Sequence, residues 1–128
     1  MPRILFVDDD AAVLRGLQAV LRSCRDRWDM VFVGSGELAL VALAEAPVDV
    51  VISDLRMPRM DGQTLLRRIK DDYPGTARIV LSGEARSSAF DDIGEVAEQV
   101  LEKPCKPAEL RSAIEEALAR RPPTPPGG

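Results

Sequence analysis

Short apolar runs alternate with helical patterns along the chain, and this alternation limits the fold more than any other feature. The apolar runs lie at residues 3–7, 30–33, 48–53, 78–81 and 99–102. Helical patterns lie at 11–23, 36–45, 62–73, 86–93 and from 107 onward. Because each crossover between parallel strands returns over one face of the sheet, this order favours helices on both faces. The sequence therefore predicts an α/β fold with a doubly wound sheet of five parallel strands.

The helical patterns place apolar residues at the spacing of one buried face. In the second pattern we expect Leu38, Val41 and Ala42 to face inward, with Ser35 capping the start of the helix. The pattern at 86–93 is the weakest, because its Ser and Asp residues lower helix propensity. The core positions expected in the other helices are Val13, Leu17, Val20, Leu21, Cys24, Leu65, Leu66, Ile69, Leu110, Ala113, Ile114, Ala117 and Leu118.

Length and composition indicate one folded domain. The chain has 128 residues, of which 45% are hydrophobic, and this is enough for a core. A net charge of -4 argues against nucleic acid binding, which needs a basic face. There is neither a membrane-spanning run nor a signal-peptide pattern, so we expect no membrane association and a cytoplasmic location. We expect the domain at 1–121 and a Pro/Gly-rich tail or linker at 122–128.

The chain contains no histidine and two cysteines. The absence of histidine excludes Ser-His-Asp and Cys-His catalysis, and also histidine ligands to zinc. Cys24 and Cys105 lie in no metal-binding spacing, and we interpret them as unpaired thiols.

Polar residues follow four of the five apolar runs. They are the Asp8-Asp9-Asp10 run, Asp54, Ser82 and Lys103. Because ligands bind at the carboxyl ends of parallel strands, these groups are expected to form one site. Clustered carboxylates raise one another's pKa unless a cation neutralises them, and Mg²⁺ prefers such oxygen ligands. For the three aspartates alone, helix capping is the competing interpretation.

This set of groups suits phosphoryl transfer. Asp54 can accept a phosphoryl group as an acyl phosphate, a known use of carboxylates. The transferred group needs its oxygens positioned and neutralised, which the Lys103 ammonium and the Ser82 hydroxyl can do beside a metal ion. Taken singly, Lys103 could be a solvated lysine and Ser82 a capping serine.

Four ordered motifs resemble the receiver domain of two-component response regulators. They are Phe-Val-Asp-Asp-Asp at 6–10, Ser-Asp-Leu-Arg-Met-Pro-Arg-Met-Asp-Gly at 53–62, Leu-Ser-Gly-Glu at 81–84 and Leu-Glu-Lys-Pro at 101–104. The resemblance covers about residues 2–121. It implies a flavodoxin-like (βα)5 fold with the strand order 2-1-3-4-5.

The resemblance also implies the roles of the acidic residues. Asp54 would be the phosphoacceptor and a ligand of Mg²⁺, the implied cofactor. Asp9 would bind the metal directly, and Asp8 directly or through water. The backbone carbonyl of Arg56 would supply a further ligand.

The remaining motif residues would respond to the phosphate. Ser82 would be the switch hydroxyl and Lys103 the phosphate-pairing lysine, with a cis peptide before Pro104. Receivers often carry Tyr or Phe three residues before the lysine, and here that position is Val100. A valine cannot reorient as a ring does, so we expect the segment at 86–93 to take over part of the response. Glu84 and Arg56 would either border the path of attacking water or form a plain surface pair.

The resemblance implies a phosphorylation-controlled signalling switch rather than an enzyme. It would catalyse only its own phosphotransfer and autodephosphorylation. The donor would be the phosphohistidine of a sensor kinase or phosphorelay protein. The expected output surface comprises the helix at 86–93, the strand at 99–102 and the helix from 107. This surface could form a homodimer or dock a partner, and an output domain could follow the linker.

Two other functions fit part of the sequence. A Mg²⁺-dependent phosphohydrolase of the haloacid-dehalogenase type would use Asp8 as its nucleophile, but Ala12 replaces its usual Thr or Val. A receiver-like interaction module would work without phosphorylation. The phosphorylated aspartate separates the two catalytic functions, Asp8 for the hydrolase and Asp54 for the receiver.

Overall fold

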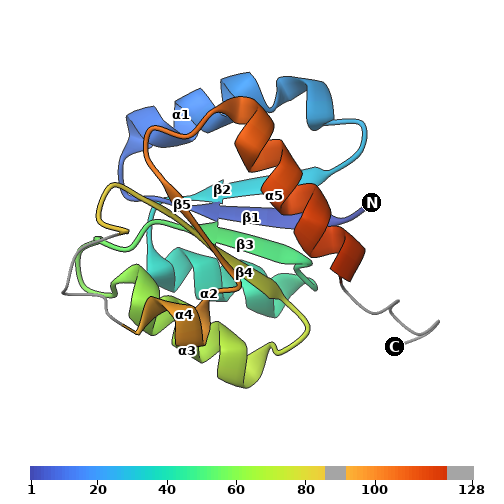
Figure 1. Ribbon diagram of the computed structural model, residues 1–128. Helices are drawn as coiled ribbons and strands as arrows, with labels where there is room; N and C mark the ends of the chain where they lie inside the picture. The colour runs from blue at the N-terminus through green and yellow to red at the C-terminus, as the bar shows by residue number, and fades with distance from the viewer. Residues whose placement is uncertain (86–91, 121–128) are drawn as a thin grey trace, which may run out of the picture.

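Five parallel strands form one sheet in the order β2-β1-β3-β4-β5, as predicted. The computed structural model describes residues 1–85 and 92–120 (Figure 1), so the predicted tail lies outside the described residues. The strands are β1 (Arg3–Val7), β2 (Asp29–Val33), β3 (Val50–Ser53), β4 (Ala77–Ser82) and β5 (Gln99–Glu102). The helices are α1 (Ala11–Val20), the 3-10 turn η1 (Arg22–Cys24), α2 (Gly36–Glu45), α3 (Gly62–Asp72), α4 (Ile93–Val96) and α5 (Pro107–Arg120). Within the described ranges, no helix is both long enough and apolar enough to cross a bilayer.

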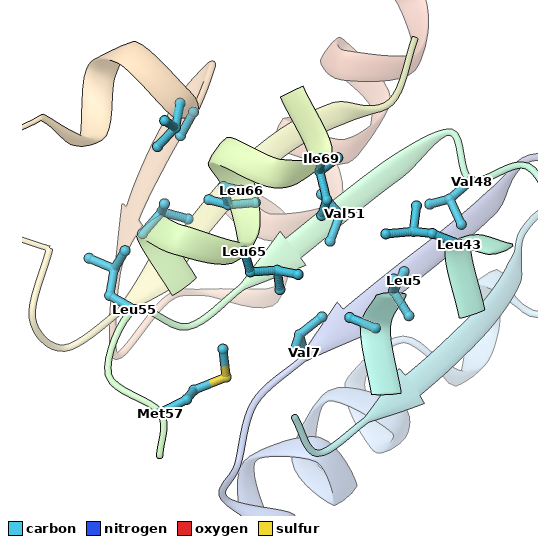
Figure 2. Close-up of a cluster of buried hydrophobic side chains, with 14 of the residues drawn as sticks. Leu5, Val7, Leu43, Val48, Val51, Leu55, Met57, Leu65, Leu66 and Ile69 are labelled. Atoms are coloured by element: carbon cyan, nitrogen blue, oxygen red, sulfur yellow. The ribbon is translucent and has the colours of Figure 1, made fainter. Parts of the chain in front are cut away.

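The helices cover both faces of the sheet, with α1 and α5 on one side and α2, α3 and α4 on the other (Figure 1). Alternate strand residues serve the two layers, because successive side chains point to opposite faces. In β1, Leu5 and Val7 join the cluster under α2 and α3 (Figure 2). Ile4 and Phe6 join the cluster under α5 and η1. The central strands are therefore apolar on both faces, and their polar residues are left at the strand ends.

Side-chain caps start three of the helices. Asp10 accepts a hydrogen bond from the backbone of Ala12 at 2.9 Å, and Asp61 accepts one from Thr64 at 2.8 Å. Ser35 accepts one from Leu38 at 3.1 Å, which confirms the predicted cap of α2. Such caps satisfy amide groups that have no partner within the helix. The first helix ends at Val20, earlier than predicted, and η1 continues the chain.

The predicted inward face of α2 is wrong for two of its three residues. Leu38 and Val41 are 52% and 54% exposed, whereas Ala42 is buried as predicted. The buried residues beside it are Ala39 and Leu43. Because α2 carries apolar residues on almost every side, the spacing of these residues does not show which face of the helix packs against the sheet.

The helix predicted at 86–93 also differs from the structure. Residues 86–91 lie outside the described residues, and the helix that is described, α4, spans Ile93–Val96. Ile93 and Val96 are buried. Basic side chains hold the end of this helix: Lys70 of α3 donates to the carbonyl of Glu95 at 2.6 Å, and Arg78 of β4 donates to that of Val96 at 2.8 Å. These contacts join distant parts of the sequence, so local propensity could not predict the position of α4.

Candidate phosphoacceptor site

Asp8 and Asp54 lie side by side because their strands are neighbours. β1 pairs with β3 in parallel, with Val7 opposite Ser53, so the next residue of each strand carries an aspartate. The amide of Asp54 donates to the carbonyl of Val7 at 3.0 Å, which extends the ladder by one residue. The two carboxylates therefore meet at the carboxyl edge of the sheet, as predicted.

Three carboxylates form a cluster at this edge. Oxygen atoms of Asp8, Asp9 and Asp54 lie within 4.8 Å of one another. Asp8 is buried, Asp54 is half-buried and Asp9 is exposed. Asp10 belongs to the same run but caps α1 instead. A set of hard oxygen donors open to water on one side fits Mg²⁺, which takes one or two carboxylates and keeps several waters.

Lys103 crosses the sheet edge to reach both Asp8 and Asp54. Its Nζ atom lies 2.6 Å from Oδ2 of Asp8 and 3.5 Å from Oδ2 of Asp54. Burial lowers the pKa of Lys103, but the hydrogen bond with Asp8 and the charge of Asp54 outweigh burial, and the pKa is raised. For Asp8, burial is the largest effect and raises the pKa, while the bonds from Lys103 and the Asp10 amide oppose it. The lysine therefore stays charged and neutralises part of the acidic cluster.

The carboxylate oxygens of Asp8 and Asp54 are held differently. Asp8 has both oxygens engaged, one by the amide of Asp10 at 2.9 Å and the other by Lys103. Asp54 accepts a hydrogen bond on Oδ1 from the amide of Leu55 at 2.8 Å. Among the residues that the structure describes, its Oδ2 has only the longer contact with Lys103. Of the two, Asp54 has the oxygen that is more available to a reacting group.

Ser82 ends β4 and is fully buried. Its Oγ accepts a hydrogen bond from the amide of Glu84 at 3.0 Å, which leaves the hydroxyl hydrogen free to donate elsewhere. The carbonyl of Ser82 accepts from the amide of Lys103 at 3.2 Å, so the two polar strand ends are adjacent. The peptide bond between Lys103 and Pro104 is cis, in agreement with the prediction.

The loop after β3 packs tightly under the site. A Cβ atom placed on Gly62 would lie 1.9 Å from the carbonyl oxygen of Asp54, so only glycine fits there. The Gly62 amide donates to the carbonyl of Leu55 at 2.7 Å, closing the loop on itself. From the sequence, Gly62 is recognisable only as part of the motif at 53–62 and as the start of a helical pattern. Its close approach to Asp54 depends on the path of the loop, which the sequence does not reveal.

Arg56 and Glu84 form an ion pair between the two loops beside the site. Nε of Arg56 lies 3.6 Å from Oε1 of Glu84, and both side chains are substantially exposed. An exposed pair of this kind contributes little to the stability of the fold. Its effect here is to hold the two loops close to each other. The pairing agrees with one predicted interpretation, and the role of the Arg56 carbonyl as a metal ligand stays a prediction.

Comparison with known proteins decides the family. The response regulator receiver domain model matches residues 4–115, which include all the residues placed above. The chain belongs to the response regulator receiver family. The sheet order and the cis peptide of this receiver are consistent with that membership.

The receiver is similar to parts of longer regulators. It is 37% identical over 123 residues to the transcriptional regulatory protein GlrR of Escherichia coli, covering 94% of the receiver and 27% of GlrR. It is 34% identical over 121 residues to the DNA-binding response regulator MtrA of Mycolicibacterium paratuberculosis, covering 92% of the receiver and 52% of MtrA. The chain therefore spans between about a quarter and about half of these relatives.

A solved structure has the same fold. The signal receiver domain of an HD domain-containing protein from Pseudomonas fluorescens Pf-5 superposes with a TM-score of 0.84 at 37% identity. The match covers 92% of this chain and 94% of that one. Membership of this family makes the chain a signalling domain of two-component systems rather than a metabolic enzyme.

Proposed function

We propose that this receiver is a phosphorylation-controlled switch that accepts a phosphoryl group on Asp54. One observation carries the proposal: the Lys103 ammonium lies between Asp8 and Asp54, within a cluster of three carboxylates. Phosphoryl transfer needs little beyond positioning and charge neutralisation, and both are present at this edge.

Asp54 is the proposed phosphoacceptor because its Oδ2 is the more available oxygen. Asp8, the nucleophile of the alternative phosphohydrolase, has both oxygens bound and is nearly inaccessible. Asp8 is therefore suited to supplying a fixed negative charge, and Asp54 is suited to reacting with the phosphoryl group. The side chain of Asp54 is also more exposed than that of Asp8, 12% against 5%.

Mg²⁺ is the proposed cofactor, held by Asp8, Asp9, Asp54 and the backbone carbonyl of Arg56. When bound, it supplies positive charge that neutralises a phosphoryl oxygen and the acidic cluster. The chain itself supplies the other partners. Lys103 keeps its positive charge at neutral pH, and the Ser82 hydroxyl has a hydrogen to donate to a phosphoryl oxygen.

The proposed transfer exchanges one bond to phosphorus for another. Oδ2 of Asp54 forms a bond to the phosphorus of a donor phosphohistidine as the N–P bond breaks. The imidazole nitrogen keeps the electron pair of the broken bond. This chain has no histidine and cannot supply the donor itself, so the proposed donor is the phosphohistidine of a sensor kinase or a phosphorelay protein.

An apolar groove next to Lys103 supports a docking place for that donor. The groove lies between α1 and the β5–α5 loop and has a volume of about 380 Å³. Its walls include Val13, Leu17, Pro104 and Cys105, and Lys103 also lines it. We propose that the donor protein docks on this groove in the cytoplasm, where its phosphohistidine can reach Asp54.

The proposed output is a change of the α4–β5–α5 surface. Val100 of β5 is 44% exposed and cannot swing as an aromatic ring would. The response would therefore run through Ser82, which releases the Glu84 amide when it turns toward the phosphate. The altered surface would form a homodimer or control a partner or output domain. We propose residues 1–121 as the receiver and 122–128 as a Pro/Gly-rich tail or linker.

Mapping the modified residue tests this function. The protein is incubated with Mg²⁺ and a small phosphodonor such as acetyl phosphate, and the labelled aspartate is located by mass spectrometry. We expect label on Asp54 in the wild type and in the matched control Asp10→Asn, and none in Asp54→Asn. Label on Asp8 would support the phosphohydrolase instead. A folded protein that takes up no label from either a small donor or a phosphohistidine protein would support the phosphorylation-independent module.

A further inference from the structure

A second pocket opens at the β2 edge of the sheet, between α1, η1 and β2. Its volume is about 470 Å³, within the range of small-molecule sites. Its lining includes Gln18, Arg22, Arg25, Trp28, Met30 and Phe32. Asp8, Asp54, Ser82 and Lys103 do not line it, so it is separate from the proposed phosphoacceptor site.

Two arginines give the pocket a positive rim. Arg22 and Arg25 are exposed, and neither forms an ion pair or a side-chain hydrogen bond with the residues that the structure describes. The neighbouring Arg27 is different, because it contacts Cys24 at 3.3 Å and Glu115 at 3.8 Å. Asp29, the acidic residue of the lining, lies 4.0 Å from Arg3. Two unpaired guanidinium groups therefore remain to meet an anion, in a chain whose net charge is -4.

The inner wall of the pocket is aromatic and apolar. Phe32 stacks on Phe6 with ring centroids 4.7 Å apart and an angle of 9° between the rings. Because β2 is the edge strand, the side of Phe32 away from Phe6 has no further strand to cover it, and the residue is only partly buried. Trp28 and Met30 complete this wall. A flat ring can extend the stack, an arrangement that is favourable beyond the area it buries.

We propose that this pocket binds a small molecule in which a planar ring carries a phosphate group, the chemistry of a nucleoside monophosphate. The ring lies against Phe32 and Met30, and the phosphate lies between Arg22 and Arg25. Guanidinium groups suit this role, because their forked donors match pairs of phosphate oxygens. Gln18 supplies an amide at the same rim, where it can bind a polar group of the ligand.

Trp28 provides a local signal for the test, because it is the single tryptophan of the chain. Its indole N–H gives one resonance in a ¹⁵N-labelled sample. The full chain is titrated with adenosine monophosphate without Mg²⁺, and in parallel with adenosine and with inorganic phosphate. We expect saturable shifts of the Trp28 indole with adenosine monophosphate, and affinities at least about tenfold weaker for each fragment.

Variants locate the binding. We expect Arg22→Gln with Arg25→Gln to weaken adenosine monophosphate binding at least about tenfold, since charge-assisted bonds are lost. Phe32→Leu is expected to weaken the binding of adenosine more than the binding of inorganic phosphate. Arg15→Gln, which removes an exposed arginine of α1 outside the pocket, serves as the matched control and is expected to bind normally. Absence of Trp28 shifts at millimolar ligand, equal binding of phosphate alone, or an equal loss in Arg15→Gln would each overturn the proposal.

Discussion

The proposed phosphoacceptor site and the α4 region both depend on basic side chains, but these bind different partners. At the site, Lys103 contacts the carboxylates of Asp8 and Asp54. At α4, Lys70 and Arg78 donate instead to the backbone carbonyls of Glu95 and Val96. A contact with a carboxylate responds directly when a metal or a phosphate alters the local charge, whereas a contact with a backbone carbonyl at α4 responds only if the surrounding chain moves. The site can therefore sense charge, while the contacts at α4 fix a position.

The largest expected effect comes from crowding the site. Gly62→Ala would place a Cβ atom 1.9 Å from the carbonyl oxygen of Asp54. The loop would have to move, and we expect a loss of about 3 kcal/mol in the free energy of unfolding. Urea denaturation measures this loss. A loss under about 1 kcal/mol would mean that the loop under Asp54 adapts freely.

The next largest effect is expected when Arg78, which holds the end of α4, is replaced. Arg78 is 9% exposed and donates to the carbonyls of Val96 and Thr76. Arg78→Met would leave these buried carbonyls without their partner, at a cost of about 2 kcal/mol. We expect hydrogen exchange to rise across residues 92–98 while the sites in β1 stay protected. The matched control is Arg68→Met, on an exposed position of α3, and equal effects of the two variants would contradict the anchoring role.

Metal binding should affect the site and leave α4 unchanged. At ten times its dissociation constant, Mg²⁺ is expected to add about 1.4 kcal/mol to the free energy of unfolding. The gain should be lost in Asp9→Asn and kept in Asp10→Asn, because Asp10 caps α1 instead of joining the cluster. Thermal unfolding with and without Mg²⁺ measures it. Loss of the gain in both variants would contradict the assignment of the cluster as the metal site.

The gain in the free energy of unfolding on Mg²⁺ binding should depend on pH in a defined direction. Burial raises the pKa of Asp8, so without metal this carboxyl takes up a proton at a higher pH than an ordinary aspartate. Its raised pKa stabilises the metal-free fold below the ordinary value of 3.8, and that contribution disappears as the pH rises through the native pKa. The gain from Mg²⁺ should therefore shrink on acidification, beginning above the pH at which a free aspartate protonates. A gain that stayed constant down to that pH would contradict this view.

The smallest effect has the opposite sign. In the part of the chain that the structure describes, nothing lies within 4 Å of a Cβ atom placed on Gly94 of α4. Gly94→Ala should stabilise the protein by about 0.5 kcal/mol, because alanine loses less entropy in a helix. Chemical denaturation of Gly94→Ala and of Gly62→Ala measures the change in the free energy of unfolding for each variant, and the two changes should have opposite signs. Destabilisation by Gly94→Ala would show that α4 is packed as tightly as the site.

The sheet and the placement of the site residues could be predicted because both depend on local patterns. Apolar runs identified the strands, and the pairing of β1 with β3 places Asp8 beside Asp54. Lys103 follows β5, two strands from β3, and its long side chain reaches back to both acids. The orientation of α2 could not be predicted, since Leu38 and Ala39 are both apolar and only packing separates them. The position of α4 depends on Lys70 and Arg78, which are distant in sequence. The pocket at β2 depends on where α1 ends, three residues before the predicted limit.

The contact between Lys103 and Asp8 joins residues 95 positions apart. During synthesis from the N-terminus, Asp8, Asp9 and Asp54 leave the ribosome long before Lys103 does. Until then the carboxylates lack the ammonium group that balances them. A chain that ends before β5 therefore contains Asp8, Asp9 and Asp54 but not Lys103, the ammonium group that contacts two of them. The last strand to be made is thus the one that brings the positive charge to the carboxylates.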